Sequence, residues 1–258
     1  MAIINQLINE IHGDSMKTKS SFKKIIKKIL LAIVLIMALF ISGLAIYSSG
    51  SYQALPEMND AIETLNLSEV TYSEKTFYIK YQVDDPILNI VFVPGGLVSP
   101  DSYKYLAASL AKEGYNVTIV KVIFNLAILT PNAAKKYLDP NMDNVIIGHS
   151  LGGVVASMVA SNNELISKIV LLGSYPIKDI SNQQSLMITA EHDIAMDQEA
   201  FNDSLKYVNS ENIIFNIDGG NHAQFGWYGP QKGDGEAEIS TLEEQNIVVS
   251  KILEFLIT

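Results

Sequence analysis

The stretch VIIGHSLGGVVASM, residues 145–158, decides the fold. An apolar run, Val145–Ile147, is followed by Gly148-His149-Ser150-Leu151-Gly152 and then by small and apolar residues at helical spacing. This order predicts a strand, a sharp turn with Ser150 at its apex and a helix, which together form a nucleophile elbow. Glycine two residues away on either side suits such a turn, because the backbone there leaves no room for a Cβ. We therefore predict that Ser150 is a nucleophile. The alternative is a serine that only caps the helix.

The composition narrows the class of protein. The chain has 258 residues, of which 48% are hydrophobic, and this suits one α/β domain with an additional segment. It contains no cysteine and four histidines, so a disulfide framework and a thiolate metal site are excluded and a histidine-based zinc cluster is disfavoured. The net charge of −10 disfavours nucleic acid as a partner. We therefore expect no metal site.

Residues 29–46 read ILLAIVLIMALFISGLAI, an uncharged apolar stretch close to the length that spans a bilayer as a helix. Six lysines precede it, which places the N-terminus in the cytoplasm and exports the remainder: Lys17, Lys19, Lys23, Lys24, Lys27 and Lys28. The stretch is either a retained single-pass anchor or a signal segment cleaved after Gly43-Leu44-Ala45. We expect a basic cytoplasmic segment at 1–28, the anchor or signal at 29–47, a linker at 48–70 and the folded domain at 71–258.

Strands and helices are expected to alternate through the exported part. Strands are predicted at 76–81, 87–93, 117–123, 145–147, 168–172, 186–190 and 213–217. Helices are predicted at 57–67, 103–113, 133–138, after the elbow, at 197–208 and at 240–256, the third of them capped by Thr130-Pro131. Apolar strands joined by helices imply a mostly parallel sheet with helices on both faces and ligands at the carboxyl ends of the strands.

A serine nucleophile needs an imidazole to take its proton and a carboxylate to orient that imidazole. Asp193 follows the strand at 186–190, and His222 lies in a glycine-rich loop after the strand at 213–217. We predict these two residues as the partners of Ser150. His192 is the alternative base and Asp197 the alternative acid, while His149 is expected to pack behind the elbow.

The oxyanion of an acyl-transfer reaction also needs backbone N–H donors. The residue after the nucleophile, Leu151, and one from the loop after an earlier strand, Gly96 or Leu97, meet this need. The alternative for the glycine pair Gly95-Gly96 is an ordinary tight turn.

From Val91 onward the chain resembles the α/β-hydrolase superfamily, and more narrowly its small dienelactone-hydrolase-like branch. The motifs that carry the resemblance are Pro94-Gly95-Gly96, GHSLGG at 148–153 and GGNHAQFG at 219–226, with further likeness at Tyr228-Gly229-Pro230 and Gly233-Asp234-Gly235. The resemblance implies an α/β-hydrolase fold, a triad of Ser150, Asp193 and His222, and ester hydrolysis without a cofactor. Dienelactone hydrolases proper use cysteine, so the resemblance does not imply lactonase activity here.

These features predict a membrane-anchored, extracytoplasmic serine esterase, or a secreted one if the segment is cleaved. The segment 174–184 is too short for a large lid, which favours small-molecule or surface-displayed esters. Residues expected near the cleft wall, unless they only pack, are Phe124, Asn125, Leu126, Gln224 and Trp227. The alternatives are another acyl hydrolase, such as a thioesterase or peptidase, and a binding module without catalysis.

Overall fold

The structure is a computed structural model that describes residues 26–161 and 163–258. The chain divides into two compact units, 1–49 and 50–258. In the first unit the described part is one helix, Ile26–Ser48, which is long and apolar enough to cross a membrane by length and composition. This agrees with the apolar helix expected at 29–46. The basic segment expected at 1–28 lies almost entirely outside the described residues.

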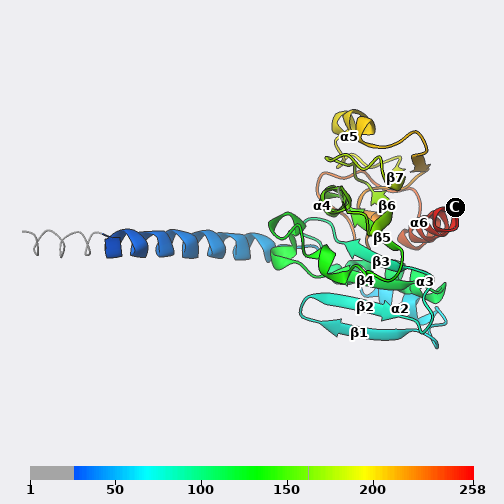
Figure 1. The fold of residues 1–258 in the computed structure, drawn as a ribbon, viewed down its shortest axis with the longest axis horizontal. Helices are drawn as coiled ribbons and strands as arrows, with labels where there is room; N and C mark the ends of the chain where they lie inside the picture. Colours follow the sequence, from blue (N-terminus) through cyan, green and yellow to red (C-terminus); the bar gives the residue numbers. More distant parts are fainter. Residues whose placement is uncertain (1–25, 162) are drawn as a thin grey trace, which may run out of the picture. The chain divides into compact units, whose positions relative to one another are not determined.

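The second unit is built on one eight-stranded sheet with the strand order β1-β2-β4-β3-β5-β6-β7-β8 (Figure 1). Its strands are β1 (Thr71–Lys75), β2 (Tyr78–Gln82), β3 (Asn89–Val93), β4 (Asn116–Val120), β5 (Asn144–His149), β6 (Ile166–Leu172), β7 (Gln184–Ala190) and β8 (Ile213–Ile217). The pairs β1–β2 and β2–β4 are antiparallel, and all other pairs are parallel. The predicted mostly parallel sheet is confirmed.

Helices cover both faces of the sheet. They are α2 (Glu57–Glu63), α3 (Lys104–Lys112), α4 (Leu151–Ala160), α5 (Gln198–Ser204) and α6 (Thr241–Leu256). The side chains of α3 and α6 join one hydrophobic cluster, and those of α4 and α5 join the other. The central strands are therefore buried on both faces, as in β3 and β5, which are buried at every position.

The predicted strand at 76–81 is wrong in its start, because a turn at Thr76-Phe77 joins two strands, β1 and β2. β1 is the edge strand, and its sequence TYSEK is exposed or half-buried at each position. An exposed edge strand needs no alternation of apolar and polar residues, so the sequence of β1 has no periodic pattern from which a strand could be predicted.

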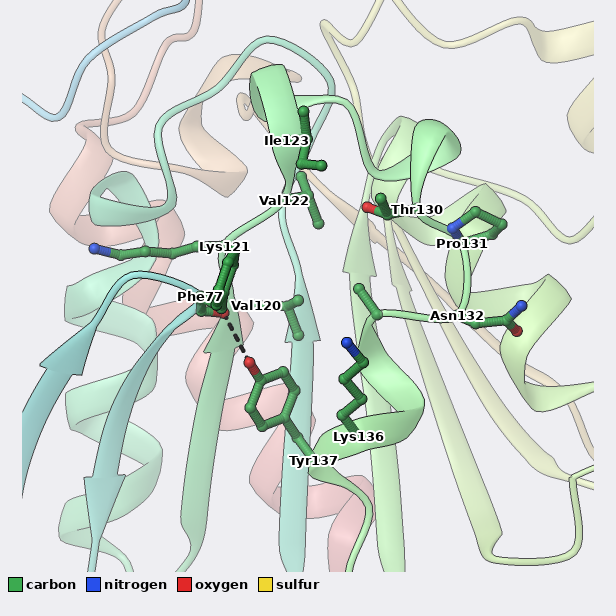
Figure 2. Close-up of a pocket in the computed structure, with 11 residues that line it drawn as sticks. Phe77, Val120, Lys121, Val122, Ile123, Thr130, Pro131, Asn132, Lys136 and Tyr137 are labelled. Carbon is green, nitrogen blue, oxygen red and sulfur yellow. Dashed lines mark hydrogen bonds between the residues drawn. The ribbon is translucent and has the colours of Figure 1, made fainter.

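The helix expected at 133–138 is also wrong. The connection from β4 to β5 holds only short 3₁₀ turns, Ile123–Asn125, Ala127–Leu129 and Ala134–Tyr137, and no side chain caps the last of these (Figure 2). The last turn ends at Leu138, whose backbone is extended, and Pro140 further disfavours a helical conformation at Asp139.

Residues 50–70, which we expected to be part of a linker, belong to the second unit. Tyr52 forms a parallel bridge with Val98, its N–H donating to the Leu97 carbonyl at 2.8 Å. Met58 of α2 is buried in a small cluster with Tyr105. The chain therefore enters the compact unit at Gly50.

Candidate active site

Ser150 occupies the turn between β5 and α4. Its backbone angles are φ 52° and ψ −126°, in the region that L residues rarely adopt. Its N–H donates to the Leu172 carbonyl at 2.9 Å, and its own carbonyl accepts from Ser174 Oγ at 2.7 Å. The end of β6 therefore holds this strained turn on both sides.

The glycines of the elbow are required by close contacts. A Cβ on Gly152 would lie 2.2 Å from the Val93 carbonyl oxygen and 2.3 Å from that of Pro94. A Cβ on Gly148 would lie 2.5 Å from the Gly152 carbonyl oxygen. The inference that these positions have no room for a side chain is confirmed.

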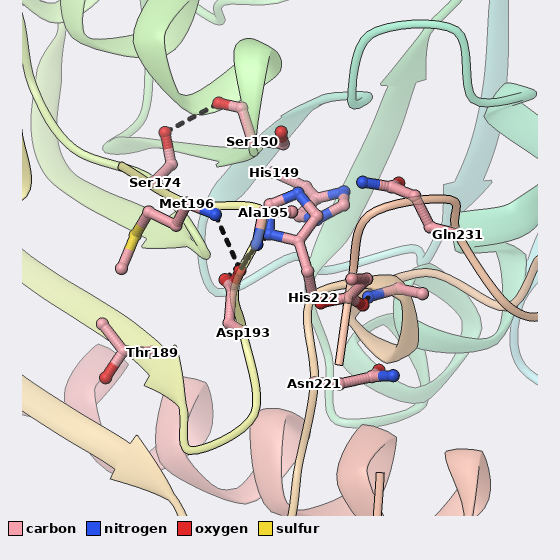
Figure 3. A network of polar contacts seen from close by, with 12 residues as sticks. His149, Ser150, Ser174, Thr189, Asp193, Ala195, Met196, Asn221, His222 and Gln231 are labelled. Carbon is pink, nitrogen blue, oxygen red and sulfur yellow. Dashed lines mark hydrogen bonds and ion pairs between the residues drawn. The ribbon is translucent and has the colours of Figure 1, made fainter. Parts of the chain in front are cut away.

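Asp193 and His222 form a buried pair at the carboxyl ends of β7 and β8. Nδ1 of His222 lies 2.8 Å from Asp193 Oδ2, and the two side chains are 3% and 0% exposed (Figure 3). The other carboxylate oxygen accepts from the N–H groups of Ala195, at 3.1 Å, and Met196, at 2.9 Å. Three hydrogen bonds therefore fix the carboxylate that orients the imidazole.

The loop that carries His222 is anchored by two carboxyl groups. The Asn221 N–H donates to Glu244 Oε2 at 3.0 Å, and the Ala223 N–H donates to Asp234 Oδ2 at 2.8 Å. Glu244 is fully buried, and this burial raises the pKa of its carboxyl to about 8. The backbone on both sides of His222 is therefore held by one residue of α6, Glu244, and by one residue of the loop that precedes α6, Asp234.

His149 connects the pair to the elbow. Its ring centroid lies 4.6 Å from that of His222, and it directly precedes Ser150. Among the described residues no hydrogen bond joins Ser150 Oγ to His222. Catalytic hydrogen bonds often tighten only when substrate is bound, so the missing Ser150–His222 hydrogen bond does not contradict the predicted roles of these residues.

His149 itself is packed, as expected. It is completely buried, and its Nδ1 lies 2.8 Å from the Tyr103 hydroxyl. Burial, together with the nearby His222, keeps the pKa of His149 well below its usual value. The contact with Tyr103 holds the His149 ring beside the elbow.

The backbone N–H groups of the glycine loop after β3 differ in their hydrogen bonding. The Gly95 N–H donates to the Tyr103 hydroxyl at 3.0 Å, and the Leu97 N–H donates to the Asn125 carbonyl at 2.8 Å. Within the described residues, the amides of Gly96 and Leu151 make no hydrogen bond. Leu151 is the first residue of α4, where N–H groups lack partners in the helix. Of the expected donors, Leu97 is therefore already occupied.

The model of the Alpha/beta hydrolase family matches residues 89–246, which hold the elbow, the buried pair and the glycine loop. The chain belongs to the α/β-hydrolase family. A search of curated proteins found no match.

Solved structures agree with the α/β-hydrolase fold. An esterase from Pyrobaculum calidifontis has 15% identity and a TM-score of 0.54, covering 78% of this chain and 90% of its own. A dienelactone hydrolase from Anabaena variabilis has 14% identity and a TM-score of 0.52, covering 72% and 98%. A predicted CIB-like hydrolase from Thermoplasma acidophilum has 14% identity and a TM-score of 0.51, covering 71% and 98%. At this identity the likeness concerns the fold.

The alternative acid and base have other contacts in this hydrolase. His192 Nε2 lies 3.4 Å from Glu238 Oε1. Asp197 accepts from the Ala200 N–H at 2.9 Å and caps α5. The structure brings Asp193 and His222 together and leaves these two residues apart.

Two of the residues expected at the cleft wall pack elsewhere. Trp227 is buried against Tyr105, with ring centroids 5.2 Å apart, and Gln224 donates from its side chain to the Ile239 carbonyl at 3.2 Å. Both are therefore structural. Phe124, Asn125 and Leu126 lie in the loop after β4, half-buried, the first two at φ 58° and 52°.

Three supporting residues were missed. Tyr103 joins Gly95 to His149, Ser174 holds the elbow carbonyl, and Gly173 leaves room for the buried pair. A glycine directly after a strand could have drawn attention to Gly173. The other two have no signal in the sequence. In the described part of the chain no group of three metal-binding side chains lies together.

Proposed function

We propose that this chain is a serine esterase in which Ser150 is the nucleophile, His222 the general base and Asp193 the residue that orients it. The observation that carries the proposal is the buried 2.8 Å contact between His222 and Asp193, at the same edge of the sheet as the strained serine. A carboxylate held by three hydrogen bonds stabilises the imidazolium that forms when the serine loses its proton.

The reaction follows from these roles. His222 takes the hydroxyl proton as Ser150 Oγ attacks the ester carbonyl, and the oxyanion is stabilised by the N–H groups of Gly96 and Leu151. Collapse of the tetrahedral intermediate releases the alcohol, which takes the proton from His222, and leaves an acyl-enzyme. Water, deprotonated by the same histidine, then releases the acid.

The substrate class is inferred from the loops around the site. The connection between β6 and β7, residues 173–183, contains no helix and forms no large lid. We infer from the short connection that the substrates are small or surface-displayed esters. Thioesters and amides would use the same three residues, so a panel of ester, thioester and amide analogues of one acyl group decides among these reactions.

The apolar helix supports a position at the cell membrane. We propose that Ile26–Ser48 stays as a single anchor with the catalytic domain outside the cytoplasm, since the lysines precede it. In intact cells external protease should digest the domain and leave the tail protected. N-terminal sequencing of a product starting at Ile46 would instead indicate cleavage and secretion.

The nucleophile is tested by Ser150→Ala, which should lower ester turnover by a factor on the order of 10⁴ with an unchanged circular-dichroism spectrum. A fluorophosphonate probe should label the unaltered chain and not this variant. His222→Ala should be nearly as damaging, while His192→Ala serves as its matched control and should cost little. Near-normal turnover without Ser150 would refute its role as the nucleophile, whereas no turnover of any substrate by the unaltered chain would favour a binding module.

A further inference from the structure

The loop after β4 and the β1–β2 turn form an apolar hollow of about 340 Å³ (Figure 2). Its lining contains neither Asp193 nor His222. Phe77 and Ile123 stand on its rim and are 62% and 51% exposed. Leu129, directly before the lining residue Thr130, is 44% exposed. Large side chains gathered in this way mark an interaction surface.

The charge around this hollow is opposite to that of the whole chain. Residues 116–138 contain three lysines and no acidic residue, whereas the chain carries a net charge of −10. Lys121 and Lys136 line the hollow, and Lys121 pairs with Glu74. Lys135 and Lys136 are exposed, and neither has an ion pair within the described residues. Exposed apolar side chains can enter the head-group layer of a membrane, and neighbouring lysines are attracted to anionic lipids.

The covalent chain restricts where this face can lie. The apolar helix ends at Ser48, and Tyr52 is already paired with Leu97 and Ser99 of the glycine loop. Four residues extend at most about 14 Å, so the chain between Ser48 and Tyr52 is a short tether. The Leu97 N–H in turn donates to Asn125, two residues from Ile123.

We propose that the surface formed by Phe77, Ile123 and Leu129, with Lys121, Lys135 and Lys136, docks on the anionic head-group layer of the bilayer that holds the Ile26–Ser48 helix. The short tether keeps the surface at a high effective concentration near lipid, so weak contacts suffice. Docking turns the carboxyl edge of the sheet, with Ser150, toward the lipid. The proposal concerns orientation and does not depend on ester hydrolysis.

The absence of cysteine allows a clean test. Full-length Ile123→Cys and Leu129→Cys variants are labelled with the fluorophore NBD and reconstituted in vesicles of equimolar phosphatidylcholine and phosphatidylglycerol. Ile87→Cys is the matched control, because Ile87 is 65% exposed and lies just before the amino end of β3, whereas the hollow follows the carboxyl end of β4. Circular dichroism verifies that each variant is folded.

Nitroxide lipids should quench the labels at 123 and 129 strongly and the label at 87 weakly. Replacing both Lys135 and Lys136 by Glu should reduce the quenching at 123 in these vesicles, since each lysine contributes about fivefold to anionic-surface binding, and should change it little in pure phosphatidylcholine. Equal quenching at 123 and 87 would overturn the proposal. So would energy transfer between labelled copies without lipid quenching, which would indicate a second copy as the partner.

Discussion

The substitution Gly173→Ala tests the buried pair without removing any of its functional groups. Gly173 follows β6 at φ +49°, and its N–H donates to the Ile188 carbonyl. A Cβ at this position would lie 2.9 Å from His222 Nδ1 and 3.0 Å from Asp193 Oδ2. The added methyl group therefore presses on both atoms of the hydrogen bond at once.

The size of the effect follows from these distances. Ordinary contacts of a Cβ begin at 3.4 Å, so the neighbours must move by about 0.5 Å. A displacement of 1 Å at a catalytic group can cost about 10²-fold in rate, and half of that displacement predicts a loss on the order of tenfold. The left-handed backbone adds a stability cost of about 1–2 kcal/mol for alanine.

The matched control is Gly233→Ala. Gly233 has φ +86°, and nothing lies within 4 Å of the position its Cβ would take. Both variants therefore carry the backbone strain, but only one presses on the pair. Hydrolysis of p-nitrophenyl acetate should fall about tenfold in kcat for Gly173→Ala and stay within about twofold for Gly233→Ala, while Tm should fall in both and further in Gly173→Ala, whose Cβ also crowds its neighbours. Equal turnover in the two folded variants would refute the catalytic role of the His222–Asp193 contact.

Two further variants test other parts of the site. Since the pKa of Glu244 is about 8 in the folded chain and about 4.3 in the unfolded chain, its contribution to stability is complete below about pH 4 and is lost as the pH rises through 8. In urea unfolding, Glu244→Gln should therefore lose less stability between about pH 5 and pH 8 than the unaltered chain; an unchanged slope would contradict this. Asp197→Ala removes the side chain that caps α5, so it should lower the free energy of unfolding by about 1 kcal/mol and leave kcat unchanged. A large loss of kcat would instead support Asp197 as the residue that orients His222.

The parts predicted well are those in which side-chain pattern and burial coincide. β5 and β3 are apolar because both faces are covered, and the order strand, Gly-x-Ser-x-Gly, helix follows from contacts that exclude a Cβ. The proximity of Asp193 and His222 could be expected because each follows a strand whose carboxyl end lies at the same end of the sheet. Topology then brings together residues 29 positions apart.

The parts predicted poorly depend on exposure or on backbone geometry. β1 has no alternating pattern, since its side chains face solvent or lie only half-buried at the edge of the sheet. The loop at 123–138 folds into 3₁₀ turns, held by main-chain hydrogen bonds such as that from Leu97 to Asn125, which leave no trace in residue type. Trp227 looked like a cleft residue because it follows His222 closely, but the chain turns back and buries it against Tyr105.

The choice of oxyanion donor shows how such main-chain bonds restrict the site. Three successive amides, Gly95, Gly96 and Leu97, are equivalent as sequence, but the first donates to Tyr103 and the third to Asn125. The Tyr103 hydroxyl, which accepts from Gly95, also contacts the histidine that directly precedes the nucleophile. One buried side chain therefore sets the position of the glycine loop relative to the elbow, and the amide left between the two occupied ones is that of Gly96. A Cβ on Gly96 would lie 2.9 Å from the Leu151 side chain, so the two loops are in contact and could present both of the proposed donors from one rigid unit.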